Sequence, residues 1–393
     1  MPNHIVFIGA HGAMCDCVEK NEIRYTLIDK PDKVDTTLIS RLSNCFLFDY
    51  ENDEFLLRII NSINDEHPIT AVVSLTESGL LQAAKASEYL ELHHTKSETV
   101  MAMKDKAKMR MRSNNVTDFP VGYNLANRIN DYFDFSSKYG YPFIAKPKDG
   151  VGSVGVRKIS SKDEISSAYT EGEMLLESFI EGKELSVETF SFSGVHHVVA
   201  ITEKEVLGGI NDNQFTEIGH KVPAGINDEE KKLIIEFTNK FLNSLEYKDG
   251  PAHTEIKIQS NKVSVIETHN RIGGDRISDL VKLSTGVDLV ELSILWPLGM
   301  CKPVVNFNES TIGSAIRFFS VKSGVVNKIS GLHNARCLPG VVNIELNLSE
   351  GDVVQPITNS FNRYGFVIAT GLNADEADKN CKRAIDSIVI NIS

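Results

Sequence analysis

The chain has 393 residues, of which 41% are hydrophobic, and it carries a formal net charge of −12. This length and composition indicate a globular protein of two or three compact units. The acidic balance argues against a general nucleic-acid or anionic-membrane binder, but it is compatible with a local basic cleft for a small anion. No apolar run has the length of a membrane span or of a signal peptide, and the six dispersed cysteines suit reduced thiols. We therefore expect a soluble, cytoplasmic protein without nucleic-acid or membrane partners.

Residues 1–95 alternate short apolar runs with helical patterns, which predicts a parallel sheet with helices on both faces. The expected strands span 5–8, 25–29 and 71–75, and the expected helices span 54–64 and 79–90. Gly9 and Gly12 after the first strand form only part of a dinucleotide fingerprint, so NAD is not expected. Thr76 and Glu77 follow the carboxyl end of a strand, where they can contact a substrate or cap the next helix.

A basic helix over 101–110 and a polar break up to Pro120 lead into a second unit. Lys106 on this helix either lies on a solvated face or points into a phosphate site. The strand over 141–147 carries Lys146 in an apolar run, and the glycine-rich loop 149–156 with Ser153 follows at once. Bare N–H groups in such a loop can wrap phosphate oxygens, although a plain β-turn has the same composition.

The segment 175–188 is predicted to form a strand, a short bend and a second strand. The backbone near Phe179 and Ile180 suits the edge of adenine, while Glu177 or Glu184 suits an exocyclic amine or a ribose hydroxyl. A surface hairpin with solvated charges explains these residues equally well. His220 lies in a loop punctuated by Gly and Pro, and it has a chemical role only if that loop faces the site.

The stretch 253–271 contains two alternating apolar runs around a Gln-Ser-Asn-Lys break, which predicts a β-hairpin centred on Asn261. In that register Glu255 lies opposite Glu267. His253 lies opposite His269 on the same face, because side chains alternate. Paired carboxylates repel each other unless a cation lies between them. The hairpin therefore predicts a metal site, with a solvated, charged strand face as the alternative.

Arg271 and Arg276 share the short loop after the hairpin, and guanidinium groups suit phosphate and carboxylate oxygens. A helix is expected over 281–298. From about residue 306 the chain predicts a smaller unit rich in β-structure. Its strands are expected over 315–320, 340–346 and 366–369, with a closing helix over 374–387.

The order of these motifs over roughly residues 1–390 resembles the ATP-grasp superfamily. The resemblance implies a mixed α/β and α+β fold in three parts. These are an N-terminal parallel α/β domain (1–95), a central ATP-grasp domain (96–305) with its Gly-rich lid loop near 149–156, and a C-terminal β-rich domain (306–393).

The resemblance also implies how ATP is bound. Lys106 and Lys146 hold the phosphates, beneath a lid that includes Ser153. The adenine and the ribose contact one segment, in which the base lies against Glu177, Phe179 and Ile180 and the sugar against Glu184.

By the same resemblance, Glu255 and Glu267 bind Mg²⁺, and Arg271 steadies the transferring phosphate. His269 takes a position at which the family usually carries Asn. This departure leaves the third magnesium ligand open, makes His269 a candidate ligand and makes Mn²⁺ an acceptable substitute. A His/Glu/Glu/His transition-metal site on the hairpin is the alternative.

Gly219-His220 with Pro223, and the Arg-x-Gly-Gly-Asp-Arg stretch from Arg271 to Arg276, look like the L-amino-acid ligase group, which makes dipeptides and related amides. This group's chemistry implies that ATP phosphorylates a small-molecule carboxylate, ADP leaves, and an amine attacks the acyl phosphate to form an amide. His220 would lie near the acyl phosphate, Arg276 would grip a carboxylate, and a homodimer would be a common assembly. An ATP-grasp carboxylase that uses bicarbonate and a non-catalytic nucleotide-binding protein are the alternatives.

Overall fold

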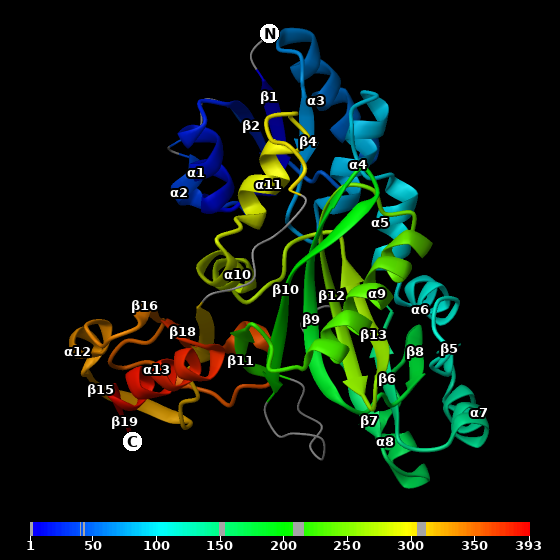
Figure 1. Cartoon of the computed structure of the whole chain (residues 1–393), viewed down its shortest axis with the longest axis vertical. Helices are drawn as coiled ribbons and strands as arrows, with labels where there is room; N and C mark the ends of the chain where they lie inside the picture. Colours follow the sequence, from blue (N-terminus) through cyan, green and yellow to red (C-terminus); the bar gives the residue numbers. More distant parts are fainter. Residues whose placement is uncertain (1–2, 40, 42–43, 149–153, 207–215, 305–311) are drawn as a thin grey trace.

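The structure is a computed structural model of the chain and describes residues 3–39, 41, 44–148, 154–206, 216–304 and 312–393. Figure 1 shows an N-terminal lobe at the top, a long central sheet below it, a small lobe at the lower right and a C-terminal lobe at the lower left. The mixed α/β and α+β fold class that we predicted is confirmed. None of the described helices is both long and apolar enough to cross a membrane.

The N-terminal lobe contains a parallel sheet with the strand order β3-β2-β1-β4. Its strand β1 is buried along its whole length, as expected of a parallel sheet that is covered by helices on both faces (Figure 1). The short strand β3 was not predicted. The elements are β1 (His4–Ile8), α1 (Gly12–Lys20), β2 (Arg24–Asp29), α2 (Thr36–Ile39), β3 (Cys45–Leu47), α3 (Asp53–Glu66), β4 (Ala71–Val73) and α4 (Leu80–Tyr89).

The predicted basic helix over 101–110 is in fact two helices, α5 (Ser97–Lys104) and α6 (Lys106–Asn114). They are separated at Asp105, whose carboxylate accepts hydrogen bonds from the backbone N–H groups of Ala107 and Lys108 at 3.0 and 3.1 Å. Such a side chain satisfies N–H groups that lack partners within the helix and so fixes its first turn. The break places Lys106 at the start of α6.

The small lobe is built on an antiparallel sheet with the strand order β5-β8-β6-β7. Its core packs aromatic side chains of α7 against β6, including Tyr132, Phe135 and Phe143. The elements are β5 (Tyr123–Ala126), α7 (Ile129–Tyr139), β6 (Phe143–Pro147), β7 (Arg157–Ile159), η1 (Lys162–Glu164), α8 (Ile165–Ala168) and β8 (Met174–Ser178).

The described strands of the central sheet follow the order β13-β12-β9-β10-β11-β14-β18-β16. The last three belong to the C-terminal part of the chain, because β14 pairs with β11 and extends the sheet. The predicted boundary near residue 306 lies outside the described residues and stays a prediction. The elements up to that point are β9 (Lys183–Phe192), β10 (Val195–Val206), β11 (Glu217–Val222), α9 (Asp228–Ser244), β12 (Gly250–Gln259), β13 (Lys262–His269), α10 (Ile277–Thr285) and α11 (Leu289–Leu295).

The single helix expected over 281–298 is therefore wrong. Gly286, with a φ of +76°, ends α10, and Asp288 caps the next helix, α11.

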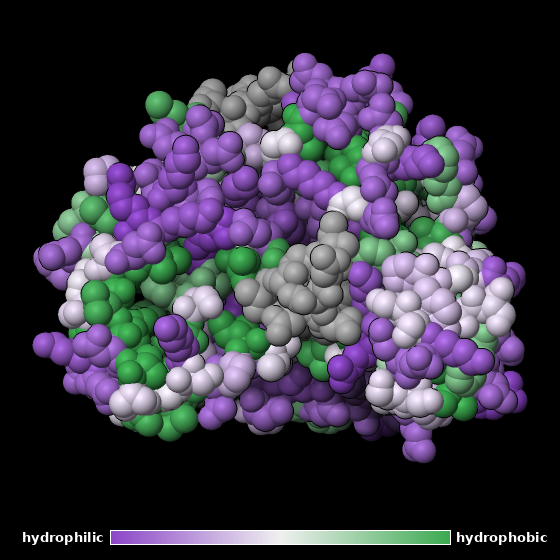
Figure 2. Space-filling model, turned by 90° about the horizontal axis from the view of Figure 1, so that it is seen from below, coloured by the Kyte–Doolittle hydropathy of each residue, from purple (hydrophilic) through white to green (hydrophobic). Residues whose placement is uncertain are grey.

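The C-terminal lobe also carries a separate three-stranded sheet in the order β17-β15-β19. Exposed valines lie on this sheet, and apolar residues gather on the left of the lower face in Figure 2, the side of the C-terminal lobe in Figure 1. The elements of this part are β14 (Gly313–Phe318), β15 (Gly324–Ser330), α12 (Leu332–Arg336), β16 (Val341–Leu346), β17 (Val353–Val354), η3 (Ser360–Asn362), β18 (Gly365–Gly371), α13 (Ala374–Asp386) and β19 (Val389–Ile392).

The hairpin of β12 and β13 has the predicted pairing of its glutamates and histidines, but its turn differs from the predicted one. Its turn is a two-residue turn at Ser260 and Asn261, both with positive φ, so that Gln259 pairs with Lys262 and not with Val263. This one-residue shift alone would separate the two carboxylates. A β-bulge at Ile266 compensates for the shift, because it adds one residue to β13. Glu255 therefore lies opposite Glu267, as predicted, and His253 lies opposite His269.

Candidate active site

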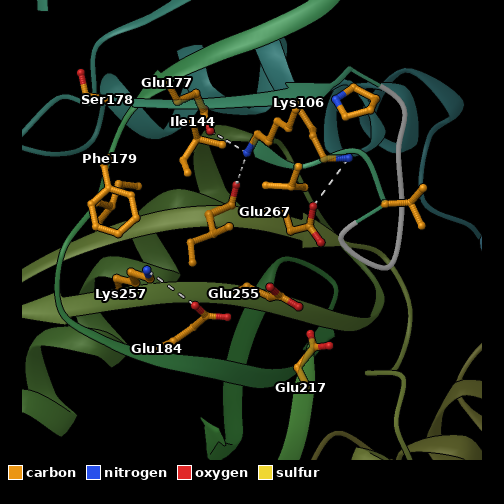
Figure 3. Close-up of a pocket in the computed structure, with 16 residues that line it drawn as sticks. Lys106, Ile144, Glu177, Ser178, Phe179, Glu184, Glu217, Glu255, Lys257 and Glu267 are labelled. Carbon is orange, nitrogen blue, oxygen red and sulfur yellow. Dashed lines mark hydrogen bonds and ion pairs between the residues drawn. The ribbon is translucent and has the colours of Figure 1, made fainter. Parts of the chain in front are cut away.

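Two cavities meet against the central sheet. The first lies between the central sheet and the small lobe and is lined by residues of α6, β6, β8, β9, β11, β12 and β13 (Figure 3). The second lies among the central sheet, the loop after β4 and the C-terminal lobe. Glu217, Glu255 and Glu267 line both cavities, so these carboxylates form the boundary between them. We call this group the acidic junction.

The two lysines predicted to hold phosphates both line the first cavity. Lys146 on β6 is buried, with its Nζ 2.6 Å from Oε2 of Glu177, and it donates a hydrogen bond to the carbonyl of Ile266 at 3.4 Å. Lys106 is also buried, and its Nζ lies 3.6 Å from Oε2 of Glu267. The bulge at Ile266 and the capped start of α6 thus direct two ammonium groups towards one end of the cavity.

Glu177 is held between two cations. Nε of Arg110 donates to its Oε1 at 2.5 Å, and Lys146 lies at its other oxygen. Burial opposes ionisation, yet Arg110 and Lys146 together hold the pKa of Glu177 below its ordinary value. Both oxygens already have partners, so the observed geometry makes Glu177 a support for Lys146, and the contact with adenine stays a prediction. Arg110 is fully buried, and the sequence analysis did not identify it.

The other end of the first cavity is apolar. Ile144, Val156, Phe179, Ile180 and Ile266 line it, which suits the faces of a planar base. Lys158 and Lys257 lie 4.5 and 4.9 Å from the ring centre of Phe179 and flank this end with positive charge.

Glu184, the predicted ribose ligand, lies on β9 beside this apolar end, 3.7 Å from Nζ of Lys257. Ser153 and most of the predicted lid loop lie outside the described residues. Val154, which follows directly, lines the first cavity.

Two carboxylates of the acidic junction, Glu255 and Glu267, have pKa values below the ordinary value of a glutamate. Burial raises the pKa of Glu267, but His269 and Lys106 outweigh it and hold the value at about 2. The pKa of Glu255 is likewise well below its ordinary value, because Lys204 and His253 outweigh the effect of burial. Buried, ionised carboxylate oxygens are the ligands that Mg²⁺ prefers, so this donor set fits the predicted metal.

His269 makes contacts that the metal hypothesis did not include. Its Nδ1 lies 3.0 Å from Oε2 of Glu77, and its Nε2 lies 3.3 Å from Oε1 of Glu267. Within the described parts of the chain, no group of three or more His, Cys, Asp and Glu side chains is arranged to hold a metal. The role of His269 as third ligand stays a prediction, and this arrangement does not support the alternative His/Glu/Glu/His transition-metal site.

In the second cavity, Glu77 and Arg271 join the N-terminal lobe to the hairpin. Nε of Arg271 donates to Oε2 of Glu77 at 2.8 Å. Burial opposes ionisation of Glu77, but His269 and Arg271 hold its pKa well below the ordinary value. Glu77 thus lies at the cavity as predicted, whereas Thr76 is hydrogen-bonded to Ser74 and does not line it.

A cluster in the lining of the second cavity contains the predicted His220 and the unpredicted Arg363. Nε2 of His220 lies 3.0 Å from Oδ2 of Asp275, and Nη1 of Arg363 donates to the same oxygen at 2.8 Å. The guanidinium of Arg363 also lies 3.6 Å from the ring centre of Phe318. Arg276, which we predicted here, is half-exposed and pairs with Asp279 at 2.7 Å, outside the cavity lining.

Arg363 is 88 residues from Asp275 in the chain, and no local pattern indicates this pairing.

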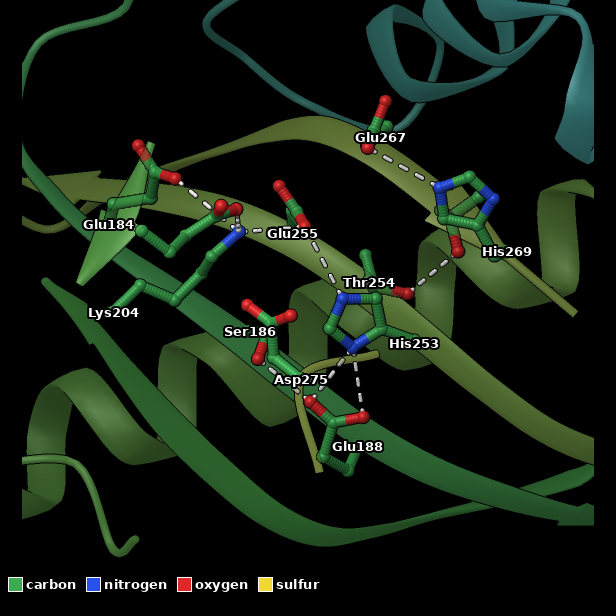
Figure 4. A network of polar contacts seen from close by, with 12 residues as sticks. Glu184, Ser186, Glu188, Lys204, His253, Thr254, Glu255, Glu267, His269 and Asp275 are labelled. Carbon is green, nitrogen blue, oxygen red and sulfur yellow. Dashed lines mark hydrogen bonds and ion pairs between the residues drawn. The ribbon is translucent and has the colours of Figure 1, made fainter. Parts of the chain in front are cut away.

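Two further groups support the acidic junction: His253, which was placed on this face of the hairpin from the sequence, and Lys204, which was not predicted (Figure 4). Nδ1 of His253 lies 2.9 Å from both oxygens of Glu188, and its Nε2 lies 3.3 Å from Oε1 of Glu255. Burial lowers the pKa of His253, but the two glutamates outweigh it and raise the value to about 9. Lys204 lies on the other side of Glu255, with its Nζ 2.7 Å from Oε1. A lysine within a buried, alternating strand was the signal that could have revealed Lys204.

The comparisons with known proteins agree with this architecture. A family model described as an ATP-grasp domain matches residues 167–279, and one described as L-amino acid ligase C-terminal domain 2 matches residues 317–393. The chain is 27% identical to an L-arginine-specific L-amino acid ligase of Bacillus subtilis, over 73% of this chain and 71% of that protein. It is 24% identical to an alanine–anticapsin ligase of Bacillus amyloliquefaciens, over 57% of this chain and 53% of that protein.

Among solved structures, the crystal structure of an L-amino acid ligase from Bacillus licheniformis superposes with a TM-score of 0.85 at 22% identity, covering 100% of this chain and 99% of that one. The chain thus contains an ATP-grasp domain over residues 167–279, and its overall fold is that of the L-amino acid ligase structure. Its C-terminal part is an L-amino acid ligase domain, and the chain is an ATP-dependent ligase related to those enzymes.

Proposed function

We propose that this protein joins the carboxylate of one small molecule to the amine of another, at the expense of ATP, through an acyl-phosphate intermediate. The observation that carries the proposal is the shared wall of the two cavities. Glu217, Glu255 and Glu267 face both a cavity suited to a nucleotide and a second, highly charged cavity. A phosphoryl group can pass between two substrates only if their sites meet in this way.

The chain's own side chains fit the first step. An oxygen of the substrate carboxylate attacks the γ-phosphorus, the bond from that phosphorus to the bridging oxygen breaks, and ADP leaves. Lys106, Lys146 and Arg271 supply fixed positive charge for the phosphoryl oxygens. Glu255 and Glu267 would hold Mg²⁺, which neutralises charge that develops on the phosphates.

In the second step the amine nitrogen attacks the acyl carbon, phosphate leaves, and the nitrogen loses a proton. We infer that His220 lies near the acyl phosphate, because it lines the second cavity and Asp275 fixes its Nε2. Arg363, which Asp275 holds beside His220, lines the second cavity where Arg276 does not, so we infer that it takes the place of Arg276 as the cation near a substrate carboxylate.

The related ligases act on amino acids by their names, which supports amino acids as one or both substrates. The test is phosphate release from ATP and Mg²⁺ across pairs of the standard amino acids, β-amino acids and dicarboxylic acids. We expect release that depends on a particular pair, with a product mass equal to the two substrates less water. ATP binding without release for any pair would contradict the proposal.

The same screen includes bicarbonate as the acid. Release that depends on bicarbonate alone, with a carboxylated product, would identify a carboxylase and overturn the ligase proposal.

A further inference from the structure

The ammonium of Lys204 is buried inside the acidic junction (Figure 4). Its side chain is only 2% exposed, and its Nζ lies 2.7 Å from Oε1 of Glu255, 3.3 Å from Oε1 of Glu217 and 3.5 Å from Oε1 of Glu184. The three carboxylates come from three different strands, β12, β11 and β9, which flank or lie near β10. Carboxylates this close repel one another unless a cation lies among them. Lys204 is therefore the resident cation of this cluster.

The position of Lys204 differs from that of the other lysines of the site. Lys106 and Lys146 line the first cavity, whereas Lys204 lines the second. Glu255 lies between the two cavities and is bonded to Lys204 through Oε1. Glu255, which is expected to bind the divalent cation, is thus already paired with the ammonium of Lys204, and Lys204 lines the second cavity.

We propose that Lys204 has two partners in turn: Glu255 in the metal-free protein, and the carboxylate of the acid substrate once Glu255 turns to a divalent cation. A carboxylate that binds a divalent cation shares its charge less with a neighbouring ammonium. Lys204 then loses much of its interaction with Glu255, the nearest of its three carboxylates, and keeps Glu217 and Glu184 at 3.3 and 3.5 Å. The carboxylate of an acid bound in the second cavity, which Lys204 lines, would replace the interaction that Glu255 gave. The acid is therefore expected to bind more tightly once the divalent cation is bound.

The first part of the inference is tested without turnover. Mn²⁺ is titrated into the nucleotide-free protein by calorimetry or electron paramagnetic resonance. Replacement of the competing ammonium in Lys204→Met is expected to tighten Mn²⁺ binding by about tenfold, because Glu255 is then available in every molecule. Unchanged or weaker binding would overturn the competition.

The matched control is Lys221→Met. Lys221 lies on the neighbouring strand β11 and pairs with Glu203 and Asp375 at 3.3 and 3.0 Å, but it lines neither cavity. Its Mn²⁺ binding should equal that of the wild type. A gain equal to that of Lys204→Met would show a general effect of net charge and would contradict the inference.

A double variant separates competition by Lys204 from a simple effect of local charge. Lys204→Met combined with Glu217→Gln removes one cation and one carboxylate, so the formal charge of the cluster equals that of the wild type. If Lys204 competes at Glu255, this double variant still binds Mn²⁺ more tightly than the wild type. If the double variant and the wild type bind Mn²⁺ with equal affinity, the net charge of the cluster alone sets Mn²⁺ binding, and the inferred competition for Glu255 is wrong.

The second part rests on the proposed function and uses the amide-forming assay. Lys204→Met should raise the KM for the acid by about tenfold or more and change the KM for ATP by less than about twofold, and Lys204→Arg should recover part of the loss. An unchanged KM for the acid would overturn the role in acid binding. If the wild type shows no acid-dependent turnover at all, the proposed function fails, and the Mn²⁺ titration still decides whether Lys204 competes for Glu255.

Discussion

Glu255 and Glu267 lie directly opposite each other on β12 and β13, with a two-residue turn and the bulge at Ile266 between them. The bulge has a second consequence, because the carbonyl of Ile266 accepts a hydrogen bond from Lys146. One irregularity in the strand thus aligns the carboxylates of the acidic junction and anchors a lysine of the first cavity.

Glu267→Gln should lower turnover by at least about 100-fold, because it removes an ionised oxygen ligand at the acidic junction. Steady-state phosphate release measures the loss. Glu236→Gln, an exposed position on α9, is the control and should retain activity. Both variants should keep the wild-type circular dichroism. Wild-type activity in Glu267→Gln would show that the hairpin is not part of the active site.

Glu177→Gln should destabilise the protein by about 3–5 kcal/mol, because it leaves the buried cations of Arg110 and Lys146 without their counter-charge. Chemical denaturation measures the free energy of unfolding. The control is Glu173→Gln, whose partially exposed pair with Lys148 should contribute no more than about 0.5 kcal/mol. Equal free energies of unfolding for the two variants would contradict the inference that Glu177 supports Lys146.

Arg363→Met should lower kcat/KM for the acid substrate by about 30-fold, or ~2 kcal/mol, because a guanidinium of the second cavity is lost. Arg276→Met provides the contrast, since Arg276 is half-exposed and lies outside the cavity lining. Steady-state kinetics at saturating ATP distinguishes the two. A larger loss of kcat/KM in Arg276→Met than in Arg363→Met would indicate that Arg276 binds the substrate carboxylate, as the sequence predicted.

At acidic pH, the free energy of unfolding of the protein should depend on the ionisation of Asp275. Burial raises the pKa of Asp275, but His220 and Arg363 outweigh it and hold the value below the ordinary 3.8. The stabilisation is therefore present above pH 3.8 and is lost as the pH falls towards the lower pKa of the folded state.

Asp275→Asn removes this dependence. The difference in urea midpoint between the wild type and Asp275→Asn should shrink as the pH falls from about 5 to about 3. A constant difference over that range would show that the charge of Asp275 contributes nothing.

Local patterns determined much of this protein. Period-two alternation predicted that Glu255 and Glu267 lie opposite each other on a hairpin, with His253 opposite His269, although the turn differs by one residue and the bulge at Ile266 restores the pairing. Local patterns also predicted the parallel strands of the N-terminal lobe and the place of Lys146 on β6. These predictions succeed because each strand signals its own existence through its own side chains.

The partners of these residues could not be predicted in this way. Lys204 meets Glu184, Glu217 and Glu255 only because β10 lies between β9 and β11 in the central sheet. Arg363 reaches Asp275 only because β14 pairs with β11 and brings the C-terminal lobe to the second cavity. Strand order and sheet continuation depend on long-range packing, which no local period records. The sequence alone determined which chemical groups the site contains, and the tertiary structure decided which charges face one another across it.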